Sequence, residues 1–303
     1  MPMVATKAPY TLLIVEDDDP INPREDYENF GKMVCWHRHY NLGDKHNYEE
    51  PRVFLSKTLF DTYSSYPGSA YGKPIYDLIK DGRAAEAKLN YNRSTHEWEL
   101  LENNYWSSGE DWYVSSSYPA SLKGKDVPDW FLDNCINALK NNEMLDMLNK
   151  SGEFVILPLY LYDHSGITMN TAGFSCPWDS GQVGWIYADR AMIEKEYDSL
   201  TPETMEKARV LLESEVKTYD YYLTGQNYGY QLFEGDLETD SCWGFLGDIR
   251  DLQNELKEYM PKGFEDIVEN MKYEYGDFDI DEYLEEVMQT EETDETEEID
   301  IEQ

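Results

Sequence analysis

Short apolar runs and segments of helical periodicity alternate along this chain. Residues 12–15 and 33–40 are rich in β-branched and aromatic side chains and lie between turn-forming residues, which predicts two strands. Pro51 then opens a segment of about 13 residues with apolar side chains at helical spacing, which predicts a helix. Residues 64–127 differ, because Tyr, Trp, Ser and Gly are frequent and periodic stretches are brief. We expect an insertion or subdomain there.

The second half of the chain carries the strongest helix and strand patterns. Helical spacing resumes at Asp129 and continues to Gly152, which predicts a helix capped by Asp129. The three apolar runs that follow predict a three-stranded meander. The remaining elements expected are a helix over 201–225, strands over 228–233 and 242–246, a helix over 248–259 and a last amphipathic helix from 264 into the 280s. The runs of the meander are 153–163, 166–171 and 182–188.

These elements predict an α+β fold: a mixed or mostly antiparallel sheet with helices packed on one side, an aromatic-rich insertion and an acidic C-terminal tail. The expected organisation is a series of five consecutive segments. They are an N-terminal part of the α+β core (1–63), the insertion or subdomain (64–127), the main α+β core (128–260), an acidic C-terminal helix (261–289) and a disordered acidic tail (290–303).

The net charge restricts the possible binding partners more than any other property of the sequence. The chain has 62 acidic residues against 25 Lys and Arg, a net charge of -37 and a pI near 4.2. This balance argues against direct binding to nucleic acid or to an anionic membrane surface. Residues 277–303 contain 14 acids and no basic residue, so the other 276 residues still carry -23. Because duplex DNA has one charge per about 1.7 Å of axis, the whole chain matches the charge of about 60 Å of duplex.

The sequence also predicts a compartment. The first residues lack the pattern of a secretory signal, and the longest near-apolar run, over 154–162, is too short to span a bilayer. The four cysteines form no CxxC pair, which favours reduced thiols. We therefore expect a cytoplasmic protein with no contact to a membrane.

Two sets of residues are candidates for chemistry. Asp163, His164, Cys176 and Asp179 are residue types used in nucleophilic catalysis, although no nucleophile elbow surrounds them. His37, His39 and His46 have a spacing at which alternate strand residues could reach one metal ion, but no companion carboxylate or thiol stands at a typical distance. No Walker loop and no G-x-G-x-x-G motif occurs, which removes the common nucleotide-binding motifs. We expect neither a metal nor a cofactor.

Two segments hold unusual residues more densely than packing requires: WHRHYNLGDKHN (36–47) and YLYDHSGITMNTAGFSCPWDSGQVGWIY (160–187). They resemble a family of proteins encoded by phages and integrative mobile elements of bacteria, which carry close variants of MVCWHRxYNLGDKH and YDHSGxTMxTxxFSCPWDSGQVGWIY. The resemblance covers the first 60 residues and roughly 150–250, and leaves the aromatic-rich insertion unmatched. It implies a mobile-element origin and supplies no activity.

Combining this resemblance with the charge gives our leading hypothesis of acidic DNA mimicry. By analogy with antirestriction and anti-CRISPR proteins, carboxylates would replace phosphates in the groove of a basic DNA-binding host protein, such as a restriction, CRISPR or other defence nuclease. The sequence does not indicate an oligomeric state. The surface acids expected to bind the partner are Asp277, Asp279, Asp281, Glu282, Glu285 and Glu286, with Glu16, Asp17, Asp18 and Asp19 second.

Three alternatives remain open at this point. An enzyme of unknown reaction would use residues 160–187 as a pocket facing His37, Arg38 and Asp44. An acidic scaffold would dock a basic partner on its C-terminal helix without mimicking DNA. Salt adaptation alone would also favour an acidic surface.

Overall fold

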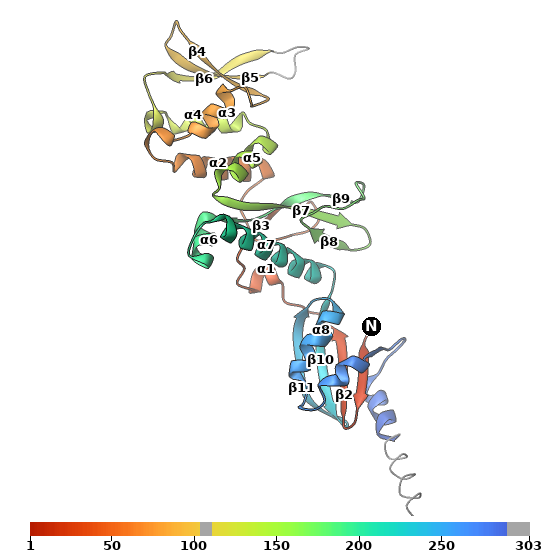
Figure 1. Ribbon diagram of the computed structural model, residues 1–303. Coiled ribbons are helices and arrows are strands. Elements are labelled where there is room, and N and C mark those ends of the chain that lie inside the picture. Colours follow the sequence, from red (N-terminus) through yellow and green to blue (C-terminus); the bar gives the residue numbers. More distant parts are fainter. Residues whose placement is uncertain (104–110, 290–303) are drawn as a thin grey trace, which may run out of the picture. The chain divides into compact units, whose positions relative to one another are not determined.

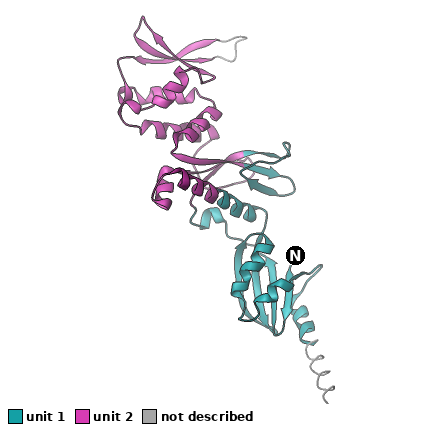
Figure 2. Ribbon diagram, viewed as in Figure 1, with its two compact units in different colours: residues 1–29, 160–182, 213–303 teal, residues 30–159, 183–212 magenta. Residues whose placement is uncertain are grey.

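The computed structural model describes residues 1–103 and 111–289, and the tail expected over 290–303 lies outside these described residues. The chain divides into two compact units, each built from separate stretches of sequence (Figure 2). Unit 1 comprises 1–29, 160–182 and 213–303, and unit 2 comprises 30–159 and 183–212. The units therefore differ from the five consecutive segments expected. The α+β class and the antiparallel pairing of strands are confirmed.

Unit 1 contains a five-stranded sheet that joins the two ends of the chain, with the strand order β11-β10-β2-β1-β12 (Figure 1). The apolar run predicted near the N-terminus forms a strand next to one from the C-terminal third, with Ile14 opposite Tyr230. The strands are β1 (Met3–Lys7), β2 (Tyr10–Glu16), β10 (Asn227–Glu234), β11 (Leu237–Leu246) and β12 (Lys272–Tyr273).

Both faces of this sheet are covered, as the period-two alternation of strand side chains requires. On one face Leu12 and Ile14 pack against Leu256 and Ile267, which lie between β11 and β12 in sequence. On the other face Leu13 packs with Leu284 and its neighbours. The covering segments on the first face are α8 (Ile249–Leu256), η3 (Lys257–Tyr259) and η4 (Glu265–Asn270).

The prediction of a single amphipathic helix from residue 264 into the 280s is wrong. The short η4 turn is followed by β12, and helical structure resumes only over 280–289. Gly276, with φ +99°, lies between them, in a conformation that side chains other than glycine rarely adopt. The acidic segment therefore adds an edge strand to the sheet, and its helical residues 280–289 pack on one face of that sheet, so the two are not one continuous helix.

A four-stranded sheet has the order β3-β9-β7-β8. The hairpin between β7 and β8 is as predicted, but the meander is wrong, because β9 lies beside β7 and not beside β8. The first strand is also shorter than expected, since it ends at Cys35 and residues 36–40 are not extended in a sheet. The strands are β3 (Lys32–Cys35), β7 (Phe154–Asp163), β8 (Ile167–Asn170) and β9 (Ser180–Asp189).

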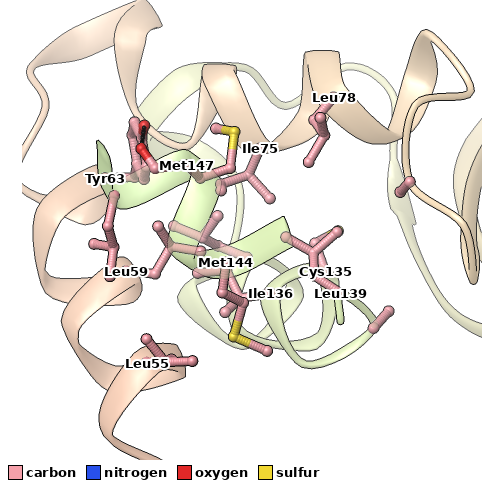
Figure 3. Packing of buried hydrophobic residues seen from close by; sticks show 14 of the residues in the cluster. Leu55, Leu59, Tyr63, Ile75, Leu78, Cys135, Ile136, Leu139, Met144 and Met147 are labelled. Carbon is pink, nitrogen blue, oxygen red and sulfur yellow. Dashed lines mark hydrogen bonds between the residues drawn. The ribbon is translucent and has the colours of Figure 1, made fainter. Parts of the chain in front are cut away.

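Four helices of unit 2 enclose its main core, in which Leu59, Ile136 and Met144 are fully buried (Figure 3). The single helix expected over 129–152 is in fact two helices, because the first helix ends with Ala138 as its C-cap. The second begins with a capping box in which the backbone N–H of Lys140 donates to Glu143 over 2.8 Å. The N-cap of the first is Pro128 rather than Asp129. The helices are α2 (Pro51–Ser64), α3 (Lys73–Lys80), α4 (Asp129–Asn137) and α5 (Asn141–Ser151).

The aromatic-rich insertion (residues 64–127) is a folded part of unit 2. Its three strands form an antiparallel sheet in the order β4-β5-β6, beside α3 (Figure 1). Leu100 and Ala87 of this sheet are fully buried in the same core as the helices. The elements are η1 (Gly68–Ala70), β4 (Ala87–Asn92), β5 (Glu97–Asn103), β6 (Trp112–Pro119) and η2 (Gly124–Asp126).

The remaining helices are α1 (Pro23–Asp26), α6 (Arg190–Tyr197) and α7 (Pro202–Leu223). The long helix opened by Thr201 is as predicted, and the Thr201 hydroxyl accepts from the backbone N–H of Thr204. Within residues 1–103 and 111–289, none of the helices has both the length and the apolar character that crossing a bilayer demands.

One buried ion pair fixes α1 within unit 1. The Arg24 guanidinium, with 1% of its side chain exposed, donates to Glu215 Oε2 over 3.1 Å and to Asn29 Oδ1 over 2.9 Å. Replacing Arg24 by Met removes the guanidinium from a nearly buried carboxylate, so we expect a loss of about 3–5 kcal/mol of unfolding free energy. Urea denaturation measures it.

The matched control is Lys207→Met, which breaks the exposed i,i+4 pair of Lys207 with Glu203. Exposed pairs of this kind contribute little. We expect this variant to unfold at the same urea concentration as the wild type, and equal effects of the two substitutions would contradict the role given to Arg24.

Candidate functional site

The two unusual segments of the sequence meet along one pair of strands. β3 leads into residues 36–47 and pairs with β9, which ends residues 160–187, with Cys35 opposite Gly184 and Val34 opposite Trp185. The Trp36 backbone N–H donates to the Val183 carbonyl over 2.7 Å, so the contact continues past the end of β3. The density of unusual residues in both segments therefore has a common structural origin.

Gly184 is required by this pairing. A Cβ atom on residue 184 would lie 1.9 Å from the Val34 carbonyl oxygen and 2.9 Å from Cys35 Cα. Both neighbours are backbone atoms of the paired strand, so they cannot rotate away. Aromatic rings occupy the space beside it, with Trp36 and Trp185 edge to face at a centroid separation of 5.9 Å.

The polar residues of 36–47 are largely used to hold their own loop. The Asp44 carboxylate accepts from the Met33 backbone N–H over 2.8 Å, and the Trp36 indole N–H donates to the Tyr48 carbonyl over 3.0 Å. His46 Nδ1 accepts from the Tyr48 backbone N–H, which leaves Nε2 to donate to the Cys35 carbonyl over 2.9 Å. Both nitrogens of His46 are thus engaged within the loop.

His37 and His39 do not project side by side from a strand, because the strand ends before them. Their rings meet edge to face at 5.9 Å, and His37 stacks on Tyr40 at 5.0 Å. His37 Nδ1 accepts from the backbone N–H groups of His39 and Tyr40. A metal ion needs several converging ligands, and the described residues contain no group of three His, Cys, Asp or Glu side chains able to hold one.

The second set of candidates does come together, around Asp179. The Cys176 thiol donates to Asp179 Oδ2 over 3.4 Å, and His164 Nδ1 lies 3.7 Å from the same oxygen. The Asp163 backbone N–H donates to the Asp179 carbonyl over 2.8 Å. A catalytic triad needs the imidazole between the nucleophile and the carboxylate, whereas here the carboxylate lies between thiol and imidazole. The arrangement orders a loop and does not have the geometry of a triad.

The surroundings of Asp179 are open. The His164 side chain is 64% exposed, and Trp178 beside Asp179 is 91% exposed. Unit 2 has cavities of about 370, 420 and 410 Å³, and none of these three has a lining residue from 160–182. An enzyme gains from a concave, partly dry site, so the position of this group does not favour the enzyme alternative.

All six acids predicted in the C-terminal segment are exposed. Phe278, Ile280 and Leu284 from the same segment face the sheet and pack with Leu13 and Val4. The segment therefore presents its carboxylates outward because its apolar residues are held by the sheet. The exposed acids are Asp277, Asp279, Asp281, Glu282, Glu285 and Glu286.

Part of this acidity has a local structural role. Asp279 Oδ1 accepts from the backbone N–H groups of Asp281 and Glu282, which caps the helical residues 280–289. Asp281 and Glu282 lie in the first turn, where negative charge interacts favourably with the helix dipole. Glu285 and Glu286 stand outside that turn.

The second set of predicted acids follows β2. Glu16, Asp18 and Asp19 are exposed, and Asp17 is half-buried. Glu16 pairs with the N-terminal amine over 2.9 Å, while Asp17 Oδ1 accepts from the Asp19 backbone N–H. These acids belong to the same unit as those of the C-terminal segment.

Charge is divided very unevenly between the two units. Unit 1 has 38 acidic and 7 basic residues, a net charge of -31, whereas unit 2 has 24 acidic and 18 basic residues, a net charge of -6. In unit 2, acids such as Glu153 have close cationic partners, and the hydrogen bond from Arg190 lowers the pKa of that carboxyl. The acidity of the chain is therefore a property of unit 1.

Comparison with known proteins found no relative: no protein-family model matches the chain, and neither a curated protein nor a solved structure is significantly similar to it.

The sequence alone did not reveal this division of charge. Unit 1 is assembled from three separate stretches, and a composition profile along the chain mixes the second stretch with basic neighbours. The cavities of unit 2 were missed for the same reason, because residues such as Lys32 and Lys57 come together only after strands and helices pack. No local sequence motif indicates either the division of charge between the units or the cavities of unit 2.

The close approach at residue 184 gives a direct test of the strand pairing. Gly184→Ala places a methyl group into the backbone of β3, so we expect a loss of about 3 kcal/mol or more in unfolding free energy. Thermal unfolding followed by circular dichroism measures it. Gly181→Ala, in the same strand with open space at its Cβ, is the control and should change stability by about 0.5 kcal/mol at most. Equal stability of both variants would contradict the pairing.

Proposed function

We propose that this protein is a mobile-element-encoded anti-defence protein that inhibits a basic, DNA-binding host protein by occupying its nucleic-acid groove with the acidic surface of unit 1. The supporting observation is the net charge of -31 in unit 1 against -6 in unit 2. Self-repulsion of this size destabilises a compact fold, and solubility would be served equally by charge spread over both units. Concentration in one unit favours a partner of opposite charge.

The C-terminal segment supports the same proposal at the level of geometry. Asp281, Glu282, Glu285 and Glu286 lie within the helical residues 280–289. At about 1.5 Å of rise per residue they place one charge per roughly 2 Å of helix axis. Duplex DNA has one phosphate per about 1.7 Å of its axis. A short acidic helix of this kind offers a basic groove a charge density close to that of its natural ligand.

The packing of this helix on the sheet argues against the scaffold alternative. A docking helix would need its apolar face free for a partner. Here Phe278, Ile280 and Leu284 are packed on the five-stranded sheet, so the outward side is the acidic one. Truncation before Asp277 is consequently a poor test of docking, because it would also uncover Val4, Leu13 and Phe233.

Neutralisation tests the proposal without removing the helix. A five-site variant loses five surface charges and retains Asp279 as the helix cap. Each exposed charge contributes on the order of 0.3–1 kcal/mol to an electrostatic contact, so we expect the affinity for a captured partner to fall about tenfold or more. The substitutions are Asp277→Asn, Asp281→Asn, Glu282→Gln, Glu285→Gln and Glu286→Gln.

The partner is first captured from a bacterial lysate by the tagged protein at low salt and then bound in purified form. Mimicry requires that it binds DNA by itself, that duplex DNA competes with this protein, and that salt weakens the complex. The matched control neutralises five exposed acids of unit 2 and should leave affinity within about twofold. These acids are Glu49, Asp126, Asp133, Asp146 and Glu206.

Three results would refute the proposal. One is the absence of a DNA-binding protein among those retained at low salt. Another is a captured partner that binds duplex DNA and this protein at the same time. The third is an equal loss of affinity in the two five-site variants. Affinity would then depend on the total charge of the protein and not on the acids of unit 1.

A further inference from the structure

The aromatic-rich insertion surrounds a cavity that the proposed function does not use. Its volume is about 420 Å³, within the range of about 300–1,000 Å³ usual for sites of small ligands. Every residue that lines it belongs to the insertion, from Ser69 to Val127. The insertion therefore forms this cavity entirely from its own strands and helices.

Aromatic side chains make up much of the cavity wall. Trp98 of β5 and Tyr118 of β6 are directly opposite each other in the sheet, so their side chains lie on the same face. Tyr118 is held by Phe131 at a ring-centroid separation of 4.5 Å, and the Lys80 ammonium lies 4.8 Å from the centre of the Trp98 ring. This wall suits a planar apolar group, which gains most by stacking on aromatic rings.

The same cavity is positively charged, in a protein with an excess of acids. Lys73, Lys80 and Lys123 line it, and Asp77 is the one acid among the described lining residues. Asp77 is already paired with Lys73 one helical turn away. Lys80 and Lys123 form no ion pair with a described residue. Two ammonium groups that form no ion pair with a described residue thus line the same cavity as the aromatic wall.

A buried hydroxyl adds a third feature. Tyr76 lines the cavity, and its hydroxyl oxygen is buried with no hydrogen-bond partner among the described residues. A phenol carries its proton at neutral pH, and burial raises the pKa of Tyr76 further, so this hydroxyl keeps a proton to donate. Unpartnered buried polar groups are uncommon in proteins, and each one calls for a physical explanation.

We propose that this cavity binds a small ligand that combines a planar aromatic ring with an anionic group, of the chemical class of a nucleoside monophosphate. The ring stacks on Trp98 and Tyr118, and the phosphate interacts with Lys80 and Lys123. A polar atom of the ring or sugar accepts from the Tyr76 hydroxyl once ligand binding opens this buried group to the cavity. This ligand site is independent of the proposed inhibition through unit 1.

Calorimetric titration of the full chain tests the proposal with AMP, GMP, CMP and UMP as probes. Adenosine supplies the ring without the anion, and ribose 5-phosphate supplies the anion without the ring. We expect at least one nucleotide to bind saturably below millimolar concentration. For AMP, each fragment should bind at least tenfold more weakly, because the two parts of the site act together.

The double variant Lys80→Gln/Lys123→Gln tests the anion part. We expect at least a tenfold loss of nucleotide affinity, with adenosine affinity changed by less than twofold. The matched control is Lys88→Gln/Lys125→Gln, two lysines of the same insertion that do not line the cavity. Lys88 lies 3.6 Å from the centre of the Trp112 ring instead. The control should bind nucleotide as the wild type does.

Tyr76→Phe separates a ligand role from a structural one. Because the hydroxyl has no partner in the free protein, its removal should leave the unfolding temperature unchanged or raise it, while nucleotide affinity falls about threefold to tenfold. A lower unfolding temperature with unchanged affinity would remove Tyr76 from the site. Absence of saturable binding by all four nucleotides, or equal losses in the two double lysine variants, would overturn the proposal.

Discussion

The antiparallel pairing of β2 with β10 is the contact on which unit 1 depends. Ile14 lies opposite Tyr230, so strands more than 200 residues apart in sequence form the centre of one sheet. The pairing brings the acids that follow β2 into the same unit as those of the C-terminal segment. The pairing also forms the two apolar faces of the sheet. The acidic helix and turns around the sheet repel one another, and packing of their apolar residues on these faces holds them in place.

Much of this fold could be predicted from local patterns. The run at residues 12–15, the Pro51 helix, the hairpin after residue 153 and the helix opened by Thr201 all formed as expected, because each is decided by neighbours in sequence. The errors concern long-range choices. Nothing near β9 indicates that it lies beside β7 rather than β8. The apolar residues of 264–284 have a spacing that suits one helix, but Lys272 and Tyr273 of this segment form an edge strand instead.

The candidate site was predicted with less success, for a related reason. The exposure of the six C-terminal acids could be expected from their charge, and the structure agrees. His37 and His39 lie beyond the end of the strand expected to carry them, and His46 is engaged by backbone groups. The side chains around Asp179 are close together, as their proximity in sequence suggested, but their order in space is that of a hydrogen-bonded loop. The sequence therefore predicted that these side chains lie close together, but it did not predict how they interact.

The strand order of the five-stranded sheet has one further consequence. Its two outer strands are the places where another chain could add itself by backbone hydrogen bonding. β12 has only two residues, and β11 exposes Glu238 and Asp240 and twice shifts register against β10. Short length, charge and bulges are the features that prevent edge-to-edge aggregation. The acidity of unit 1 therefore also protects this sheet from growing into a polymer when the protein is abundant.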